Sequence, residues 1–249
     1  MLKIGKIAAQ SAANLTLDVL KSHPIEAQIV LFETDADAYI ALQSADIQMI
    51  AKPMQHLESS LPTGIVITAL SARQKAGATL YIHPSAVGTG GGLSLKTGVK
   101  IRVNTLLEKV QLSAFDPDWK VVLSGDADAF LVTDEVSNDL KINGFDTFYL
   151  NPKELIPLAG QGVIAYLTRK DDLPTRRILQ QIHHPHVSAC TNIERTIKNL
   201  FRKRGLIGAY CERDAQDNFH LWVCDATGKT IRVSQNTHFG LAETALAHY

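Results

Sequence analysis

Two stretches of the chain share the same order of strand, helix and strand, and this weak duplication limits the folds that are possible. The first begins with an apolar segment at residues 2–5 and continues with an amphipathic segment at 11–20. It ends with an Ala-Asp pair just before the apolar residues 47–50. The second stretch repeats this order at residues 99–102, 104–112 and 129–132. Alternating strands and helices are typical of a parallel α/β sheet.

The last third of the chain has a different pattern. Helical periodicity is followed by short alternating segments that predict antiparallel strands. We expect helices at 174–182, 191–201 and 241–248, and strands at 205–211, 220–225 and 230–233. This region therefore predicts a separate α+β domain.

Four glycines lie within residues 88–92. They lack the G-x-G-x-x-G spacing of a dinucleotide-binding loop, because Leu93 stands where the third glycine is needed. We interpret this segment as an interdomain hinge rather than a phosphate-binding loop.

Composition excludes several classes of protein. The chain has 249 residues, is 45% hydrophobic and has zero net charge, which favours a globular protein over a nucleic-acid-binding one. Its three cysteines form neither a disulfide framework nor a zinc motif and fit a reducing compartment. Lys3 and Lys6 interrupt any signal-peptide core, and no apolar run is long enough to cross a membrane. We therefore expect a cytoplasmic protein with neither a nucleic-acid nor a membrane partner.

Several short segments, spread over nearly the whole chain, resemble elements of one enzyme family. The sharpest is Pro-Leu-Ala-Gly-Gln-Gly at 157–162, which resembles the family's P-A-x-G-Q-G. Others are 44–47 (R-A-D-I), 125–129 (G-x-Y-D-A), 183–184 (N-H-H), 194–195 (A-E-R) and 206–210 (P-I-G-S-Y). Together they resemble hydroxymethylbilane synthase, also called porphobilinogen deaminase.

The resemblance implies a fold of two periplasmic-binding-protein-like α/β domains and a small C-terminal α+β domain. We place domain 1 at 1–94 and 155–168, a shortened domain 2 at 95–154, and domain 3 at 169–249. It also implies an activity: the stepwise condensation of four porphobilinogens onto a covalently held dipyrromethane. That chemistry needs an anchoring cysteine, a carboxylate near the pyrrole nitrogen, and arginines for the substrate's carboxylates.

The anchor and the carboxylate are missing at the matching positions. Lys203 stands at the place of the family's cysteine, and Cys211 is nearby on a predicted strand, where a buried structural thiol is the simpler interpretation. The family's S-M-K-D-x-P matches a segment with Lys52 followed by proline, and no acid lies between 47 and 57. We expect Glu58 to lie on a solvated loop and His56 to be polar surface.

The arginines are also missing. Only Arg73 and Arg102 occur in residues 1–168, whose charged side chains sum to −4, whereas residues 169–249 sum to +4. Leu107 and Glu108 stand where the family has an arginine pair. Losing one bidentate pair would cost ~1.5–3 kcal/mol of affinity.

These absences favour a non-catalytic hydroxymethylbilane synthase-like protein that holds a small molecule in an interdomain cleft. The candidate ligand-binding residues are Ser11, Lys52, Arg102, Thr105 and Gln161. One alternative is an active deaminase with a rearranged site, using Cys211 and, only then, a dipyrromethane cofactor. Another is an enzyme of different chemistry, although the sequence offers no recognisable nucleophile–base pair.

Two further motifs have ordinary interpretations. The histidines of 183–186 lack a Cys, Asp or Glu at ligand spacing, so we predict no metal. The basic run 202–204 has no interleaved aromatics, so we expect a solvated loop. The oligomeric state does not follow from the sequence.

Overall fold

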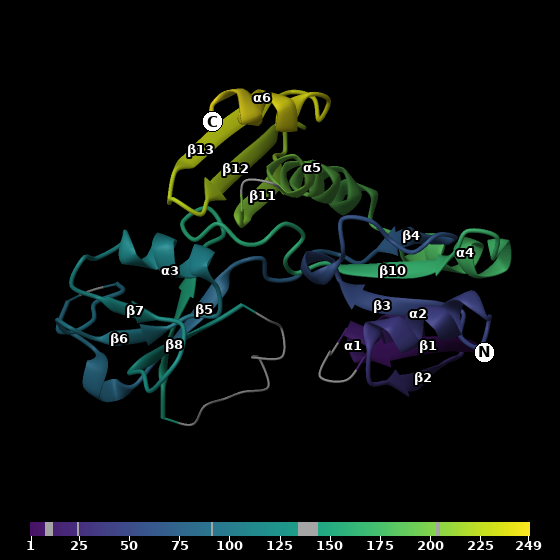
Figure 1. The fold of residues 1–249 in the computed structure, drawn as a ribbon, viewed down its shortest axis with the longest axis horizontal. Coiled ribbons are helices and arrows are strands. Elements are labelled where there is room, and N and C mark those ends of the chain that lie inside the picture. Colours follow the sequence, from purple (N-terminus) through teal and green to yellow (C-terminus); the bar gives the residue numbers. More distant parts are fainter. Residues whose placement is uncertain (8–11, 24, 91, 134–143, 203–204) are drawn as a thin grey trace. The chain divides into compact units, whose positions relative to one another are not determined.

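The protein folds into two compact units, described here from a computed structural model (Figure 1). The structure describes residues 1–7, 12–23, 25–90, 92–133, 144–202 and 205–249. Unit 1 comprises Met1–Gln74 and Gly160–Ala189, and unit 2 comprises Lys75–Ala159 and Cys190–Tyr249. Each unit is formed from two separate stretches of chain.

Unit 1 contains a five-stranded mixed sheet with the order β2-β1-β3-β10-β4. β1 is parallel to both β2 and β3, whereas β10 is antiparallel to β3 and β4. The strands are β1 (Leu2–Ile7), β2 (Ala27–Phe32), β3 (Met49–Pro53), β4 (Ile65–Leu70) and β10 (Ile164–Arg169). The helices are α1 (Ala12–Lys21), α2 (Asp35–Gln43), η1 (Met54–His56), α4 (Leu173–Leu179) and η4 (Gln180–Ile182).

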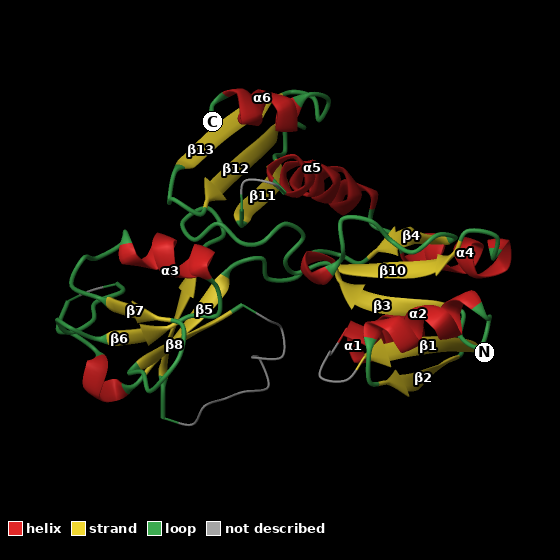
Figure 2. Ribbon diagram, in the orientation of Figure 1, coloured by secondary structure: helices red, strands yellow, loops and turns green. Residues whose placement is uncertain are grey.

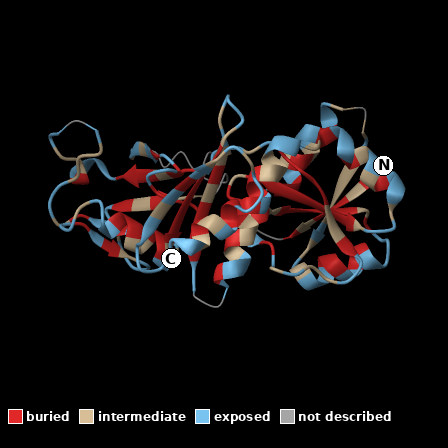
Figure 3. Cartoon of the chain, turned by 90° about the horizontal axis from the view of Figure 1, so that it is seen from above, coloured by how far each residue is buried: buried red, intermediate tan, exposed pale blue. Residues whose placement is uncertain are grey.

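Alternation along the strands gives this sheet two buried faces. Ile7, Ile50 and Leu167 pack into a core that includes residues of α2, whereas Ile4, Met49 and Tyr166 pack into a second core that includes residues of α1. Because successive side chains of a strand point to opposite faces, near-continuous apolar strands fit a sheet covered on both sides (Figures 2 and 3).

Unit 2 contains a second five-stranded sheet, with the order β7-β6-β8-β5-β9. β6 is parallel to β7 and β8, and β5 is antiparallel to β8 and β9. Its elements are β5 (Ala78–Ile82), η2 (Pro84–Ala86), β6 (Lys100–Arg102), α3 (Leu106–Ser113), β7 (Lys120–Val122), β8 (Ala129–Val132) and β9 (Asp146–Leu150). The core contains residues from all five strands and from α3.

A small antiparallel sheet in the C-terminal part of unit 2 consists of β11 (Ile207–Arg213), β12 (Phe219–Asp225) and β13 (Thr230–Gln235), in that order. α6 (Leu241–Ala247) packs on β12 and β13. The long helix α5 (Pro185–Phe201) precedes this sheet. The small sheet is joined to the larger one through Leu107 of α3, which shares a buried cluster with Ile156 and Trp222.

The predicted fold class is confirmed: two mixed α/β sheets precede a small α+β region. The parallel sheets that we predicted are parallel only in part, because β10 returns from the second stretch of unit 1 and pairs antiparallel to β3. The second sheet also begins earlier than the domain boundary predicted at residue 94, because its strand β5 begins at Ala78. Since β5 pairs with β8 and β9, the glycines of 88–92 lie within unit 2 rather than at a hinge between units.

The C-terminal elements match the expected pattern, with one helix longer than predicted. α5 begins at Pro185 instead of 191, since proline is tolerated in the first turn of a helix. In the part of the chain that the structure describes, no helix is both long and apolar enough to cross a membrane.

Candidate functional site

A buried lysine is at the centre of the candidate site in unit 1. Lys52, on β3, has a side chain that is 1% exposed. Its Nζ lies 2.7 Å from Oδ2 of Asp35 and 2.9 Å from Oε1 of Glu58. Asp35 is the first residue of α2, which follows β2, and Glu58 follows η1, which follows β3. The two acids therefore come from the segments after β2 and β3, whereas Lys52 lies on β3 itself. We call Lys52, Asp35, Glu58 and Tyr39 the Lys52 cluster.

Tyr39 of α2 completes the cluster. Its hydroxyl donates a hydrogen bond of 3.0 Å to Oε2 of Glu58, and its ring centroid lies 5.6 Å from Nζ of Lys52. Burial, and then the negative charge of Glu58, raise the pKa of Tyr39 well above its ordinary value. Burial alone would also raise the pKa of Glu58, but the hydrogen bond and charge of Lys52 outweigh it and lower that pKa. The tyrosine therefore stays protonated and the glutamate ionised at neutral pH.

The Lys52 cluster contains two carboxylates and one ammonium, so its net charge is −1. Oδ1 of Asp35 is buried and has no hydrogen-bond partner among the described residues. Lys52 is consequently already neutralised, which leaves little positive potential for a ligand carboxylate. Glu58 lies on an exposed loop, as we expected, but its carboxylate also binds Lys52 and Tyr39.

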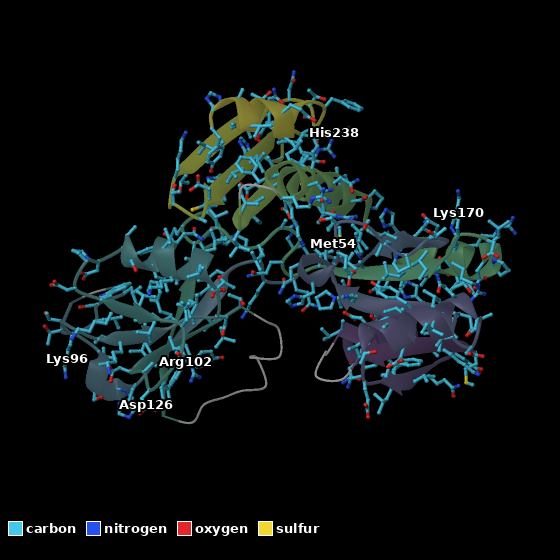
Figure 4. All side chains as sticks on the ribbon, viewed as in Figure 1. Met54, Lys96, Arg102, Asp126, Lys170 and His238 are labelled. Atoms are coloured by element: carbon cyan, nitrogen blue, oxygen red, sulfur yellow. The ribbon has the colours of Figure 1, made fainter. Side chains whose placement is uncertain are left out.

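Gln161 lies at the same edge of the unit 1 sheet. It is 3% exposed and precedes β10, whose Ile164 pairs with Pro53 at the end of β3. Gly160 has a φ of +82° and lies against Met54, so a side chain at this position would collide with the methionine. Met54, labelled in Figure 4, donates its backbone N–H to Val163 O at 2.8 Å. These contacts hold residues 160–163 against η1.

The other two described candidates lie in unit 2. Arg102 ends β6, and its guanidinium carbon lies 4.6 Å from the ring centroid of Phe130 (Figure 4). Thr105 is the N-cap of α3 and accepts a hydrogen bond of 3.2 Å from the N–H of Glu108. Glu108 Oε2 in turn accepts the N–H of Thr105 at 2.9 Å, which completes a capping box. Of the four described candidates, Lys52 and Gln161 thus lie in unit 1, and Arg102 and Thr105 lie in unit 2.

The residues at the two positions where the resemblance implies an arginine pair have structural roles. Leu107 is 1% exposed and packs with Ile156, Trp222 and Cys224, while Glu108 caps α3. Neither residue presents a cation.

The remaining residues are Ser11, a ligand-binding candidate, and Lys203 and Cys211, which concern the anchor. Ser11 and Lys203 lie outside the described residues. Cys211 is 2% exposed on β11, and its N–H donates a 2.7 Å hydrogen bond to Oε1 of the fully buried Glu194. Its buried position on a strand is the one that we predicted, and it leaves the thiol out of reach of a ligand in this conformation.

The histidine motif has a structural role in unit 1. Nδ1 of His183 accepts the backbone N–H of Leu70 at 3.1 Å, and the N–H of His184 donates to Leu70 O at 3.1 Å. Burial, then the neighbouring His184, lower the pKa of His183. Within the described ranges, no group of three or more His, Cys, Asp or Glu residues has the arrangement of a metal site.

Comparison with known proteins agrees with the fold and the motifs. No family model matches the chain. Porphobilinogen deaminase of Chloroherpeton thalassium is 26% identical over 168 residues, which cover 61% of this chain and 51% of the relative. That of Exiguobacterium sibiricum is 30% identical over 159 residues, covering 55% and 48%. The chain thus spans about half the length of these curated relatives.

Solved structures with similar folds include two binding proteins. A nutrient binding protein from Burkholderia cenocepacia, bound to methionine, aligns over 81% of this chain and 97% of its own, with 14% identity and a TM-score of 0.43. The periplasmic aliphatic sulphonate binding protein of Escherichia coli aligns over 82% and 75%, with 15% identity and a TM-score of 0.42.

The sheets and their order define a protein with two five-stranded mixed α/β sheets and a small three-stranded α+β region. The sequence is similar to those of curated porphobilinogen deaminases, from which it diverges at 24–30% identity.

Sequence reasoning identified Lys52 and Gln161 but missed Asp35 and Tyr39. Asp35 is 17 residues away from Lys52 along the chain. The only available signal was its position after the apolar residues 29–32, which we did not predict as a strand but which form the end of β2. The carboxyl ends of parallel strands meet at one edge of a sheet.

Proposed function

We propose that this protein is a porphobilinogen deaminase-like protein without deaminase activity, and that it binds a small molecule at the carboxyl edge of β1 and β3. This edge is where ligands bind in open α/β sheets, because the connections on either side diverge there. The scaffold is supported by homology, whereas the loss of activity is argued from the site, since a fold alone does not carry a function. The observation that carries the proposal is the Lys52 cluster.

Lys52 matches the lysine of the family's S-M-K-D-x-P segment, but its charge is consumed internally. Two carboxylates lie within 2.9 Å of Nζ, and the residue that follows is Pro53 rather than an acid. A ligand carboxylate about 4 Å from one uncompensated negative charge would be repelled by up to about 4 kcal/mol at an effective dielectric constant of about 20. Water around the half-exposed acids reduces this value. The edge therefore disfavours a polycarboxylate.

The means of holding a primer are also missing from the described residues. Dipyrromethane needs an accessible thiolate, whereas Cys211 is buried among strand residues. Leu107 and Glu108 supply packing and a helix cap in place of two guanidinium groups. Chain growth on a covalent primer would need both an accessible thiolate and guanidinium groups that bind the substrate's carboxylates.

The test is incubation of the purified protein with porphobilinogen, combined with intact-mass measurement. We expect no consumption of porphobilinogen and a mass equal to that of the polypeptide. A mass increase matching dipyrromethane, lost in Cys211→Ser, together with porphobilinogen turnover, would overturn the proposal and establish the rearranged deaminase.

The ligand-binding part of the proposal has its own test. Thermal shift measurements compare small amines with polycarboxylates of similar size. Only compounds that lack several carboxylates should stabilise the protein. The control is Glu58→Gln, which removes one negative charge from the cluster and should weaken the discrimination. Stabilisation of the unaltered protein by polycarboxylates alone would contradict the proposed specificity.

We also propose a cytoplasmic location. All three cysteines are free and buried, as expected of a protein that folds in a reducing compartment. Fractionation of cells that express the tagged protein from its own gene tests this, and recovery outside the cytoplasm would contradict it.

A further inference from the structure

Three polar side chains on the small sheet of unit 2 form a hydrogen-bonded chain. Nδ1 of His220 lies 2.7 Å from Oγ of Ser234, and Nε2 lies 2.9 Å from Oδ2 of Asp214. His220 and Ser234 face each other as a register pair of β12 and β13. These distances are those of a nucleophile, a base and an orienting carboxylate.

The β11–β12 hairpin fixes the carboxylate of Asp214. Its Oδ1 accepts backbone N–H groups from Gln216 at 2.9 Å and from Asn218 at 2.8 Å. The turn is closed by a 2.9 Å hydrogen bond from Asp214 N to Asn218 O, and Asp217 has a φ of 67°. Oδ2 lies 2.9 Å from Nε2 of His220 and also accepts the side-chain amide of Asn218 at 3.2 Å. The hydrogen bond from His220, and then those from the turn, lower the pKa of Asp214 to about 2.

This arrangement determines which ring nitrogen accepts a proton. An ionised carboxylate can only accept hydrogen bonds, so Nε2 of the neutral imidazole carries its proton toward Asp214. Nδ1 is then the basic nitrogen, and the hydroxyl of Ser234 donates to it. The order of the nitrogens is the reverse of that in the serine proteases, but either nitrogen can act as the base once the other is protonated.

A cation and an aromatic ring lie beside the serine. Arg232 and Ser234 are alternate residues of β13 and therefore share one face of the sheet. The guanidinium carbon of Arg232 lies 5.0 Å from the ring centroid of Trp222, which in turn lies 6.0 Å from the ring of His220. Arg232 forms no ion pair with any described residue, whereas Lys153, on the same tryptophan, is neutralised by Glu212 at 2.6 Å. The available positive charge is thus next to the hydroxyl.

We propose that Ser234, His220 and Asp214 form a hydrolytic site for small carboxylic esters that carry an anionic group. Ser234 Oγ bonds to the ester carbonyl carbon while its proton passes to Nδ1 of His220. The bond from that carbon to the alcohol oxygen breaks, and the alcohol leaves with the proton, so the acyl group is held on Ser234. Water then attacks the acyl carbon, its proton returns to Ser234 through His220, and the carboxylic acid is released.

The other two residues assist this reaction. Arg232 binds the anionic group of the ester, because an exposed and unpaired guanidinium is a strong partner for a carboxylate. Asp214 is a positioning residue that keeps the proton on Nε2. This site lies entirely within unit 2 and is independent of the Lys52 cluster, so either proposal can fail without the other.

Covalent labelling tests the nucleophile. Purified full-length protein is treated with a fluorophosphonate, which bonds its phosphorus to an activated serine oxygen and releases fluoride. Peptide mapping should find the label on Ser234, and Ser234→Ala should not be labelled. Ser85→Ala is the matched control: Oγ of Ser85 lies 2.6 Å from Nδ1 of His83, but no described carboxylate bonds to that histidine. This control should be labelled as the unaltered protein is.

Ester hydrolysis tests the roles of the other residues. 4-Nitrophenyl acetate and the mono-4-nitrophenyl ester of succinic acid supply a neutral and an anionic acyl group. We expect Asp214→Asn to lower kcat about 100-fold for both esters. Arg232→Gln should raise KM about tenfold for the succinyl ester and leave KM for the acetyl ester unchanged. Circular dichroism establishes that each variant is folded.

Two results would overturn the proposal. One is the absence of label on Ser234 of the unaltered protein at any fluorophosphonate concentration that labels a serine hydrolase run in parallel. The other is hydrolysis by Ser234→Ala at the rate of the unaltered protein. Because Ser234 is exposed on an edge strand, its alanine variant is expected to fold even if Asp214→Asn does not.

Discussion

Replacing Lys52 with methionine removes the only cation of the Lys52 cluster and keeps an unbranched side chain that is one atom shorter. The two carboxylates would then lose their shared partner at 2.7 and 2.9 Å. Breaking a fully buried ion pair by removing one partner costs about 3–5 kcal/mol. Here Asp35 and Glu58 retain 39% and 44% exposure, so water compensates for much of that loss. We expect Lys52→Met to lower the free energy of unfolding by about 1–3 kcal/mol at pH 7.

The pH dependence separates this electrostatic effect from packing. The folded-state pKa of Glu58 is lowered from 4.5, so its contribution to stability is complete above 4.5 and is lost as the pH falls through the folded pKa. In Lys52→Met the pKa of Glu58 rises again because its partner is gone. The difference in stability between the two proteins should therefore decrease as the pH falls below 4.5.

Urea unfolding of Lys52→Met, Glu58→Gln and the double variant measures the coupling directly. We expect Glu58→Gln to cost less than Lys52→Met, because it leaves Lys52 paired with Asp35. The double-mutant cycle should give a favourable coupling of about 0.5–2 kcal/mol between Lys52 and Glu58. Zero coupling together with a pH-independent effect would refute the reasoning, since the lysine charge would then contribute nothing through the glutamate.

Three further measurements test local features of the fold. Gly160→Ala should lower the free energy of unfolding by about 1–3 kcal/mol more than Gly98→Ala does, measured by thermal unfolding. Both glycines have a positive φ, but of the two only Gly160 lies against a side chain. Thr105→Ala should cost about 1 kcal/mol by loss of the α3 N-cap, and Thr105→Ser should recover most of it; equal melting temperatures for both variants would argue against the cap. Ultraviolet titration should find Tyr39 still protonated at a pH where exposed tyrosines are ionised, and Glu58→Gln should lower its pKa; a normal titration of Tyr39 would contradict the cluster geometry.

The order of elements could be predicted because hydrophobic periodicity follows directly from local geometry. The strands of the duplication and the C-terminal sheet were found in this way. The pairing of distant segments could not be predicted: β5 alternates poorly and lies before a glycine-rich segment, yet it pairs between β8 and the edge strand β9 of the second sheet. Nothing in residues 78–82 themselves specifies which sheet they join.

The sites show the same limit. Lys52 could be named from its neighbours in sequence. Its pairing with carboxylates could not be predicted, because Asp35 lies 17 residues away, in the segment that follows β2. The chain of Asp214, His220 and Ser234 combines separations of 6 and 14 residues across a three-stranded sheet, and no periodic pattern marks it. A lone serine, histidine or aspartate is ordinary surface until the sheet register places it opposite a partner.

The replacements at 107 and 108 suggest why the arginine-poor first two thirds of the chain can be stable. An arginine pair that serves a substrate must hold two charges near the surface without partners from its own chain. Leu107 instead joins α3 to Trp222 of the small sheet, and Glu108 satisfies the N–H groups of Asn104 and Thr105 at the start of α3. At both positions, where the resemblance to the family places an arginine, this chain makes an internal contact. Restoring the arginines would therefore remove a packed leucine and a helix cap as well as add charge. The stability of the helix and the recognition of a polycarboxylate consequently compete for the same two positions.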